Sequence, residues 1–198
     1  MFGRVAVLGL CLLAVLSPDS VLNGTAPAVV AEVPFAAPSQ LQAAPPQPAP
    51  AAANTSPSRL LIPRIGVDAV IEARGLDASR NMETPRNFHD VAWYDLGPTP
   101  GETGNALING HVDWWTGSAV FTRLHELRTG DTVIVVQGDG SRLSFRVTGR
   151  TTVAAGARVA SLFAPSPVAK LTLITCAGVW DPRIFTNTQR LLVSAVLV

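Results

Sequence analysis

The sequence predicts an all-β fold, either a sandwich or a closed barrel, for the region 59–198. Short runs rich in Val, Ile, Leu and Thr alternate there with turn residues, and helical periodicity is nearly absent. The dipeptide Asp139-Gly140 lies between two alternating runs, which is a strong hairpin signal. At about 140 residues, this region is long enough to bury one hydrophobic core.

Each expected element follows from its local sequence. The expected strands cover residues 59–65, 69–72, 105–108, 132–137, 143–148, 171–175 and 191–198. Pro63 indicates an edge or bulge position in the first strand, because proline cannot donate a ladder hydrogen bond. Residues 119–127 (AVFTRLHEL) predict one short helix, ended by Gly130, and residues 159–163 predict a further helical turn.

Composition divides the chain into two unlike parts. Residues 1–58 hold only three charged side chains, Arg4, Asp19 and Glu32, so the 47% hydrophobic content does not describe the domain alone. The formal net charge of +1 gives no support for nucleic-acid binding. The longest apolar run, residues 5–16, is too short for a polytopic membrane protein.

The N-terminal part predicts export. Arg4 followed by the apolar run 5–16 is typical of a signal peptide or an uncleaved membrane anchor, which we place at residues 1–22. Residues 23–58 predict a disordered Ala/Pro-rich linker, since residues 37–57 alone contain seven Ala and six Pro. We therefore expect an extracytoplasmic domain that is secreted or held at the membrane through its N-terminus.

The domain contains one cysteine, Cys176, at the end of the apolar run 171–175. An unpaired thiol outside the cytoplasm is a liability unless it is used, although a buried structural cysteine fits this feature equally well. A nucleophilic thiol needs a base. His111 follows a predicted strand and the bend Asn109-Gly110, which makes it the best candidate, whereas His89 and His125 are interpreted as surface histidines.

Charge stabilisation for an oxyanion requires a further group. Arg190 begins the last predicted strand, 14 residues after Cys176, and would lie at the same end of the domain if the two strands were neighbours. Arg183, in the intervening loop, is the rival candidate. The sequence predicts no metal site and no cofactor, because it has no HExxH motif, no paired cysteines and no phosphate-binding loop.

These residues carry a resemblance to a known family. The string Thr172-Leu-Ile-Thr-Cys176, with His111 65 residues before it and Arg190 after it, resembles the sortases, the cell-surface cysteine transpeptidases of bacteria. The strings 106–113, 119–131 and 173–178 are similar to the class F branch of actinobacteria. The resemblance covers residues 59–198 and implies a closed eight-stranded β-barrel.

The resemblance also implies roles. Cys176 would attack the Thr carbonyl of an LPxTG-like sorting signal on a surface protein, and His111 would act as general acid and base. Arg190 would hold the substrate carbonyl or oxyanion, and a peptidoglycan precursor amine would resolve the thioacyl enzyme. Thr175, Ala177 and Trp180 are expected to contact substrate. Ala177 replaces a more usual Gly and Trp180 narrows the site, so both bear on substrate preference.

Three other functions compete with this interpretation. A thiol hydrolase would use the same three residues and release the acyl group to water. An L,D-transpeptidase is disfavoured, because the SHGC-type string of that family is absent around Cys176. A non-catalytic barrel that binds cell-wall material would be marked by loss of a triad member, and all three are present.

Overall fold

The computed structural model describes residues 56–114 and 117–198. The expected signal peptide or anchor lies outside the described residues, as does nearly all of the expected linker. Within the described ranges, no helix is both long enough and apolar enough to span a membrane.

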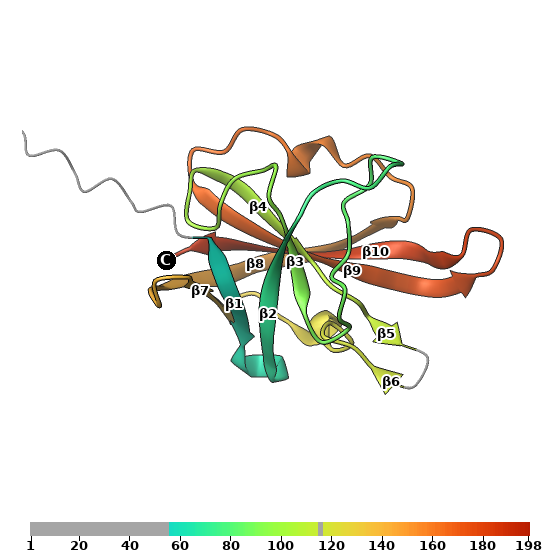
Figure 1. Cartoon of the computed structure of the whole chain (residues 1–198), viewed down its shortest axis with the longest axis horizontal. Helices are drawn as coiled ribbons and strands as arrows, with labels where there is room; N and C mark the ends of the chain where they lie inside the picture. Colours follow the sequence, from blue (N-terminus) through green and yellow to red (C-terminus); the bar gives the residue numbers. More distant parts are fainter. Residues whose placement is uncertain (1–55, 115–116) are drawn as a thin grey trace, which may run out of the picture. The chain divides into compact units, whose positions relative to one another are not determined.

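Eight strands close into a barrel, which confirms the predicted fold (Figure 1). The order around the barrel is β1 (Pro57–Ile62), β2 (Val67–Arg74), β3 (Val91–Tyr94), β4 (Gly104–Asn109), β9 (Ala169–Asp181), β10 (Thr186–Leu197), β8 (Arg142–Ala154) and β7 (Thr132–Gln137). Two neighbouring pairs, β2–β3 and β4–β9, are parallel, and the others are antiparallel. A separate two-stranded sheet joins β5 (Asp113–Trp114) to β6 (Gly117–Ser118).

In residues 171–175 of β9, both faces of the strand are buried. Leu171 and Leu173 belong to the core inside the barrel, whereas Ile174 belongs to a second cluster with Leu107 and Leu192. We call this second group the outer cluster. The loop after β8, which contains the 3-10 turn η3 (Ala160–Leu162), packs against it. Burial on both faces explains why the sequence of β9 reads as a continuous apolar run rather than an alternating one.

The structure corrects three local expectations. Only the 3-10 turn η2 (Leu124–Glu126) forms within the predicted helix 119–127, because its buried residues Phe121, Leu124 and Leu127 recur every three positions, the period of a 3-10 turn. The strand predicted through Pro63 ends at Ile62, and Pro63 begins the turn η1 (Pro63–Ile65). Strand β3 was not predicted, because no tight-turn signal joins this short apolar run to either of its partners, β2 and β4.

Candidate active site

The parallel pairing of β4 with β9 brings distant parts of the chain to one edge of the barrel. Their register ends with Asn109 opposite Ile174. Just beyond, the Gly110 amide donates to the Ile174 carbonyl at 3.1 Å, and the Thr175 hydroxyl donates to the Gly110 carbonyl at 2.8 Å. The next residue on one side is His111 and on the other Cys176. Two residues that are 65 positions apart in the sequence therefore lie at the same edge of the barrel.

Cys176 is a free thiol that lies inside a strand, not at its end as the sequence predicted. β9 continues to Asp181 and pairs with β10, and this hairpin extends beyond the rest of the barrel (Figure 1). The expected position was wrong because the continuous run of buried residues ends at Thr175, whereas the pairing with β10 continues through Asp181. What changes at Cys176 is burial: Thr175 is buried, whereas Cys176 is half-buried.

Arg190 lies directly opposite Cys176 in the β9–β10 ladder. Its Nη1 donates to the carbonyls of Asn187 and Gln189 at 2.9 and 2.8 Å, and its Nη2 donates to the Thr186 hydroxyl at 3.0 Å. A guanidinium has five N–H groups. The three that are used fix the group beside the thiol, and the Nε hydrogen and one Nη2 hydrogen have no partner among residues 56–114 and 117–198.

The rival arginine is engaged elsewhere. Arg183 lies at the tip of the β9–β10 hairpin, 85% exposed, and its Nη2 is 2.7 Å from Asp181 Oδ2. The hydrogen bonds from Arg183 hold the pKa of the Asp181 carboxyl below its usual value. Its guanidinium does not line the cleft that contains Cys176. The geometry therefore favours Arg190 over Arg183.

The loop between β2 and β3 holds the imidazole of His111. The Nε2 of His111 lies 3.2 Å from the Pro85 carbonyl. A carbonyl only accepts hydrogen bonds, so this contact requires the hydrogen on Nε2 and leaves Nδ1 for proton exchange. The Phe88 ring packs against the imidazole at 4.6 Å between centroids. Asn109 adds a second tether, donating from Nδ2 to the Glu83 carbonyl at 2.9 Å.

Cys176, His111 and Arg190 line one cleft of about 1380 Å³ on the outside of the barrel. Its walls include apolar side chains of the outer cluster and its neighbours, among them Met82, Val159, Leu162, Ile174 and Leu192. Within the described residues, no hydrogen bond joins His111 to Cys176 directly. The thiol instead lies 4.0 Å from the hydroxyl of Thr186.

The three residues expected to contact substrate differ in how they face this cleft. Trp180 is 59% exposed and lines the cleft from the hairpin. Thr175 also borders the cleft, yet its side chain is buried and its hydroxyl is bound to Gly110. Ala177 packs against the core inside the barrel and is not among the residues that line the cleft. Their roles as substrate contacts stay predictions.

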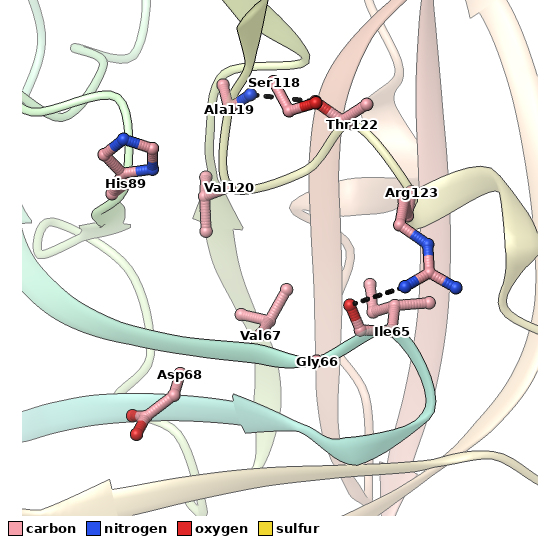
Figure 2. A pocket seen from close by; sticks show the side chains of 10 residues that line it. All are labelled: Ile65, Gly66, Val67, Asp68, His89, Ser118, Ala119, Val120, Thr122 and Arg123. Atoms are coloured by element: carbon pink, nitrogen blue, oxygen red, sulfur yellow. Dashed lines mark hydrogen bonds between the residues drawn. The ribbon is translucent and has the colours of Figure 1, made fainter.

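The remaining two histidines lie away from the cysteine. His89 borders a smaller cavity of about 240 Å³, where Arg123 Nη1 donates to the Ile65 carbonyl at 3.5 Å (Figure 2). His125 is exposed, and its Nδ1 lies 3.1 Å from the Thr122 carbonyl. Among the described residues, His111 is thus the one histidine in the cleft of Cys176. No group of three or more His, Cys, Asp or Glu side chains in this part of the chain is placed to hold a metal ion.

Sequence reasoning missed the groups that hold the site together. The string Asn87-Phe88-His89 drew attention to His89, whereas its neighbour Phe88 is the residue that contacts His111. The Pro85 carbonyl leaves no signal in a sequence. Thr186 could have been noticed only by its position four residues before Arg190. The long arginine side chain can lean along its own strand and reach a residue at that spacing.

Comparison with known proteins gives one consistent result. The family model described as the sortase domain matches residues 60–198. Sortase C-1 from Actinomyces oris is similar in structure, with 25% identity, a TM-score of 0.56, and coverage of 71% of this chain and 72% of that one. A lid mutant of sortase A from Corynebacterium diphtheriae has 26% identity, a TM-score of 0.56, and coverage of 71% and 68%. Sortase C1 from Streptococcus suis, at 20% identity, shows the same fold with a TM-score of 0.57 and coverage of 73% and 74%. The comparison with curated proteins gave no match.

Proposed function

The chain belongs to the sortase family of cysteine transpeptidases, and we propose that it joins surface proteins to a cell-wall amine. In this proposal it cleaves an LPxTG-like sorting signal between Thr and Gly and forms a thioacyl-enzyme intermediate. The observation that carries the proposal is the meeting of Cys176, His111 and Arg190 in one cleft, from three separate segments of the chain. The class F-like subtype inferred from the sequence is part of the same proposal.

In this proposal Cys176 forms the bond to the substrate carbon, and His111 carries out the proton transfers. Cys176 reacts as the thiolate while His111 carries a hydrogen on both ring nitrogens. The sulfur attacks the Thr carbonyl, and the tetrahedral intermediate collapses as the bond to the Gly nitrogen breaks. The leaving amine needs a proton, which His111 supplies from Nδ1 while its Nε2 hydrogen stays with the Pro85 carbonyl. The same nitrogen then takes a proton from the incoming amine, which attacks the thioester and releases Cys176.

Arg190 suits the charge that develops on the substrate. Its guanidinium is fixed by three hydrogen bonds before any ligand arrives, so it needs little reorganisation during the reaction. The two remaining N–H groups can donate to the carbonyl oxygen as it becomes an oxyanion. A group that is already oriented stabilises the transition state more than one that has to be ordered first.

The shape of the cleft supports an extended peptide as the substrate. The apolar wall from the outer cluster offers a surface for the Leu and Pro side chains of a sorting signal, next to the cysteine. Trp180 borders the cleft from the hairpin, where we place the residues after the scissile bond. An extended peptide crossing from one side to the other would present its Thr carbonyl to Cys176.

Sortases act outside the cytoplasm at the cell surface, and we propose that this chain is attached to the membrane there through residues 1–22. The Ala/Pro-rich residues that follow would hold the domain away from the bilayer at roughly 3 Å per residue. The amine acceptor in this proposal is a peptidoglycan precursor.

Product analysis tests the proposal. The full chain is incubated with a fluorogenic LPxTG peptide and a panel of amines, including diaminopimelate and oligoglycine, and the products are identified by mass spectrometry. We expect a new amide between the peptide Thr and an amine. Formation of free acid alone, at every amine concentration, would instead identify a thiol hydrolase.

Variants assign the residues. Cys176→Ala is expected to abolish cleavage with an unchanged circular dichroism spectrum, and retained cleavage would exclude Cys176 as the nucleophile. Arg190→Ala is expected to lose at least about a hundredfold in kcat/KM, the scale of one oxyanion donor. Arg183→Ala is the matched control, and loss in this variant with normal activity in Arg190→Ala would reverse the assignment.

A further inference from the structure

Thr186 occupies a position between two of the proposed catalytic groups. Arg190 Nη2 donates to the Thr186 oxygen at 3.0 Å, and the same oxygen lies 4.0 Å from the sulfur of Cys176. We propose that the Thr186 hydroxyl donates its hydrogen to the Cys176 thiolate and so stabilises it, and that the Arg190 cation strengthens this hydrogen bond by donating to the same oxygen. This inference rests on the proposed function for the role of Cys176 as the nucleophile.

The direction of these hydrogen bonds follows from the chemistry of the groups. A guanidinium can only donate, so the Thr186 oxygen is the acceptor in its contact with Arg190. A thiolate can only accept, so when Cys176 is ionised the hydroxyl hydrogen of Thr186 has to point toward the sulfur. A hydroxyl that accepts from a cation is polarised and becomes a better donor. The donor and acceptor roles are therefore compatible in both contacts, from Arg190 to Thr186 and from Thr186 to Cys176.

A bulge in the hairpin places Thr186 over the cysteine. The pairing passes from Ala177 opposite Gln189 to Trp180 opposite Asn187, which leaves two residues of β9 facing one residue of β10. One of the two is Gly178, whose φ of 77° suits glycine. A bulge bends its strand and increases its twist. Without it, a straight ladder would carry Thr186 away from Cys176, since Cys176 pairs with Arg190 four residues later.

No competing partner for the thiol is seen among the described residues. His111, the proposed acid and base, is bonded to the Pro85 carbonyl and makes no hydrogen bond to Cys176. The charged and titratable side chains that share the cleft with Cys176 are Arg80, His111, Asp113, Arg158 and Arg190. Of these, Arg190 is the one linked to the sulfur through an intervening hydroxyl.

Alkylation of Cys176 tests the inference without any substrate. The full chain is treated with iodoacetamide from pH 5 to 10, and modification at Cys176 rather than Cys11 is followed by peptide mass spectrometry. In Thr186→Val we expect alkylation at pH 7 to be about three- to tenfold slower, the net effect of one hydrogen bond. The midpoint of the curve of rate against pH should move upward, because the thiolate has lost a donor.

Three controls separate the hydroxyl from packing. Thr186→Ser keeps the hydroxyl and should react like the wild type, whereas Thr152→Val makes the same change at an exposed position of β8 and should change nothing. In an Arg190→Ala background, Thr186→Val should have a smaller effect, because the two groups act as a unit. Thr186→Ala replaces the Val variant if that variant is misfolded.

The outcomes are distinct. An unchanged curve for Thr186→Val, or a Thr186→Ser variant as slow as Thr186→Val, would overturn the role of the hydroxyl. Either result could occur in an enzyme that still joins peptide to amine, so the proposed function would survive. Conversely, an enzyme whose Cys176→Ala variant still cleaves peptide would overturn the proposed function, whatever the alkylation rates.

Discussion

Replacing Thr175 by Val tests whether the side-chain hydrogen bond from β9 to the end of β4 positions the proposed catalytic residues Cys176 and His111. The Thr175 hydroxyl donates to the Gly110 carbonyl at 2.8 Å, between the residue before Cys176 and the residue before His111. Val has nearly the same shape, so the change removes one buried donor and leaves the carbonyl with one partner fewer. We expect the free energy of unfolding to fall by about 1–3 kcal/mol.

The same strand offers a matched control. Thr172 is as buried as Thr175, and its hydroxyl donates to Asn105 Oδ1 at 2.9 Å, four residues away from the cysteine. Thr172→Val should lower stability by a similar amount, about 1–3 kcal/mol, and leave activity close to that of the wild type. Thr175→Val should also lower kcat by about tenfold or more with little change in KM, because small misplacements of catalytic groups are costly.

Urea unfolding of the full chain gives the stabilities, and peptide cleavage at a temperature where both variants are folded gives the kinetics. Equal losses of kcat in the two variants would mean that activity follows stability alone. A fully active Thr175→Val would mean that the backbone ladder fixes the pair without the hydroxyl. Either result would refute the positioning argument.

Three further predictions concern the hairpin beyond the barrel. Gly178→Ala should lower the stability of the protein by about 1–2 kcal/mol in urea unfolding, because the position has a φ of 77° and the new Cβ would lie 2.5 Å from the Thr188 hydroxyl. Phe185→Asn should raise stability by about 0.5–1 kcal/mol, since Phe185 has a φ of 51° with 80% of its surface exposed, and Asn tolerates this conformation better; a lower Tm would contradict this. Arg183→Ala should raise the pKa of the Asp181 carboxyl, as followed by NMR. Because the pKa of Asp181 is lowered in the folded protein, this carboxylate stabilises the fold at pH values above its ordinary pKa of 3.8. That stabilisation is lost as pH falls through the lower, folded-state pKa, so the stability of Arg183→Ala should depend less on pH in this range.

The parts of the fold that were predicted are those in which apolar residue types indicate a buried strand. The runs 132–137 and 171–175 are apolar because they are buried, and both appear as strands in the barrel. The hairpin beyond Thr175 could not be predicted in the same way, because its apolar residues Val179 and Trp180 are exposed. Strand β3 was not predicted because loops, and no tight turns, connect it to its parallel partner β2 and its antiparallel partner β4.

Cys176 and His111 could be selected because each is a rare residue type next to a recognisable run, and Arg190 could be selected because it begins the last predicted strand. His111 follows β4 and Cys176 follows the buried part of β9, and the parallel register of these strands then brings them together. Their supports could not be selected. The Pro85 carbonyl acts through the backbone, and Thr186 depends on a bulge whose presence is decided by pairing rather than by composition.

The three proposed catalytic groups are supported by parts of the molecule that we expect to differ in stability. Cys176 follows directly on buried core residues of β9, whereas His111 is held by a loop and Arg190 bonds to a hairpin that extends beyond the barrel. Local opening is least costly where few apolar contacts are broken. The loop and the hairpin should therefore open without unfolding the barrel, which would let a peptide enter around a cysteine that does not move. Hydrogen exchange should then be slow at Leu173 and faster at Trp180 and Phe88, and equal protection at all three would contradict this division.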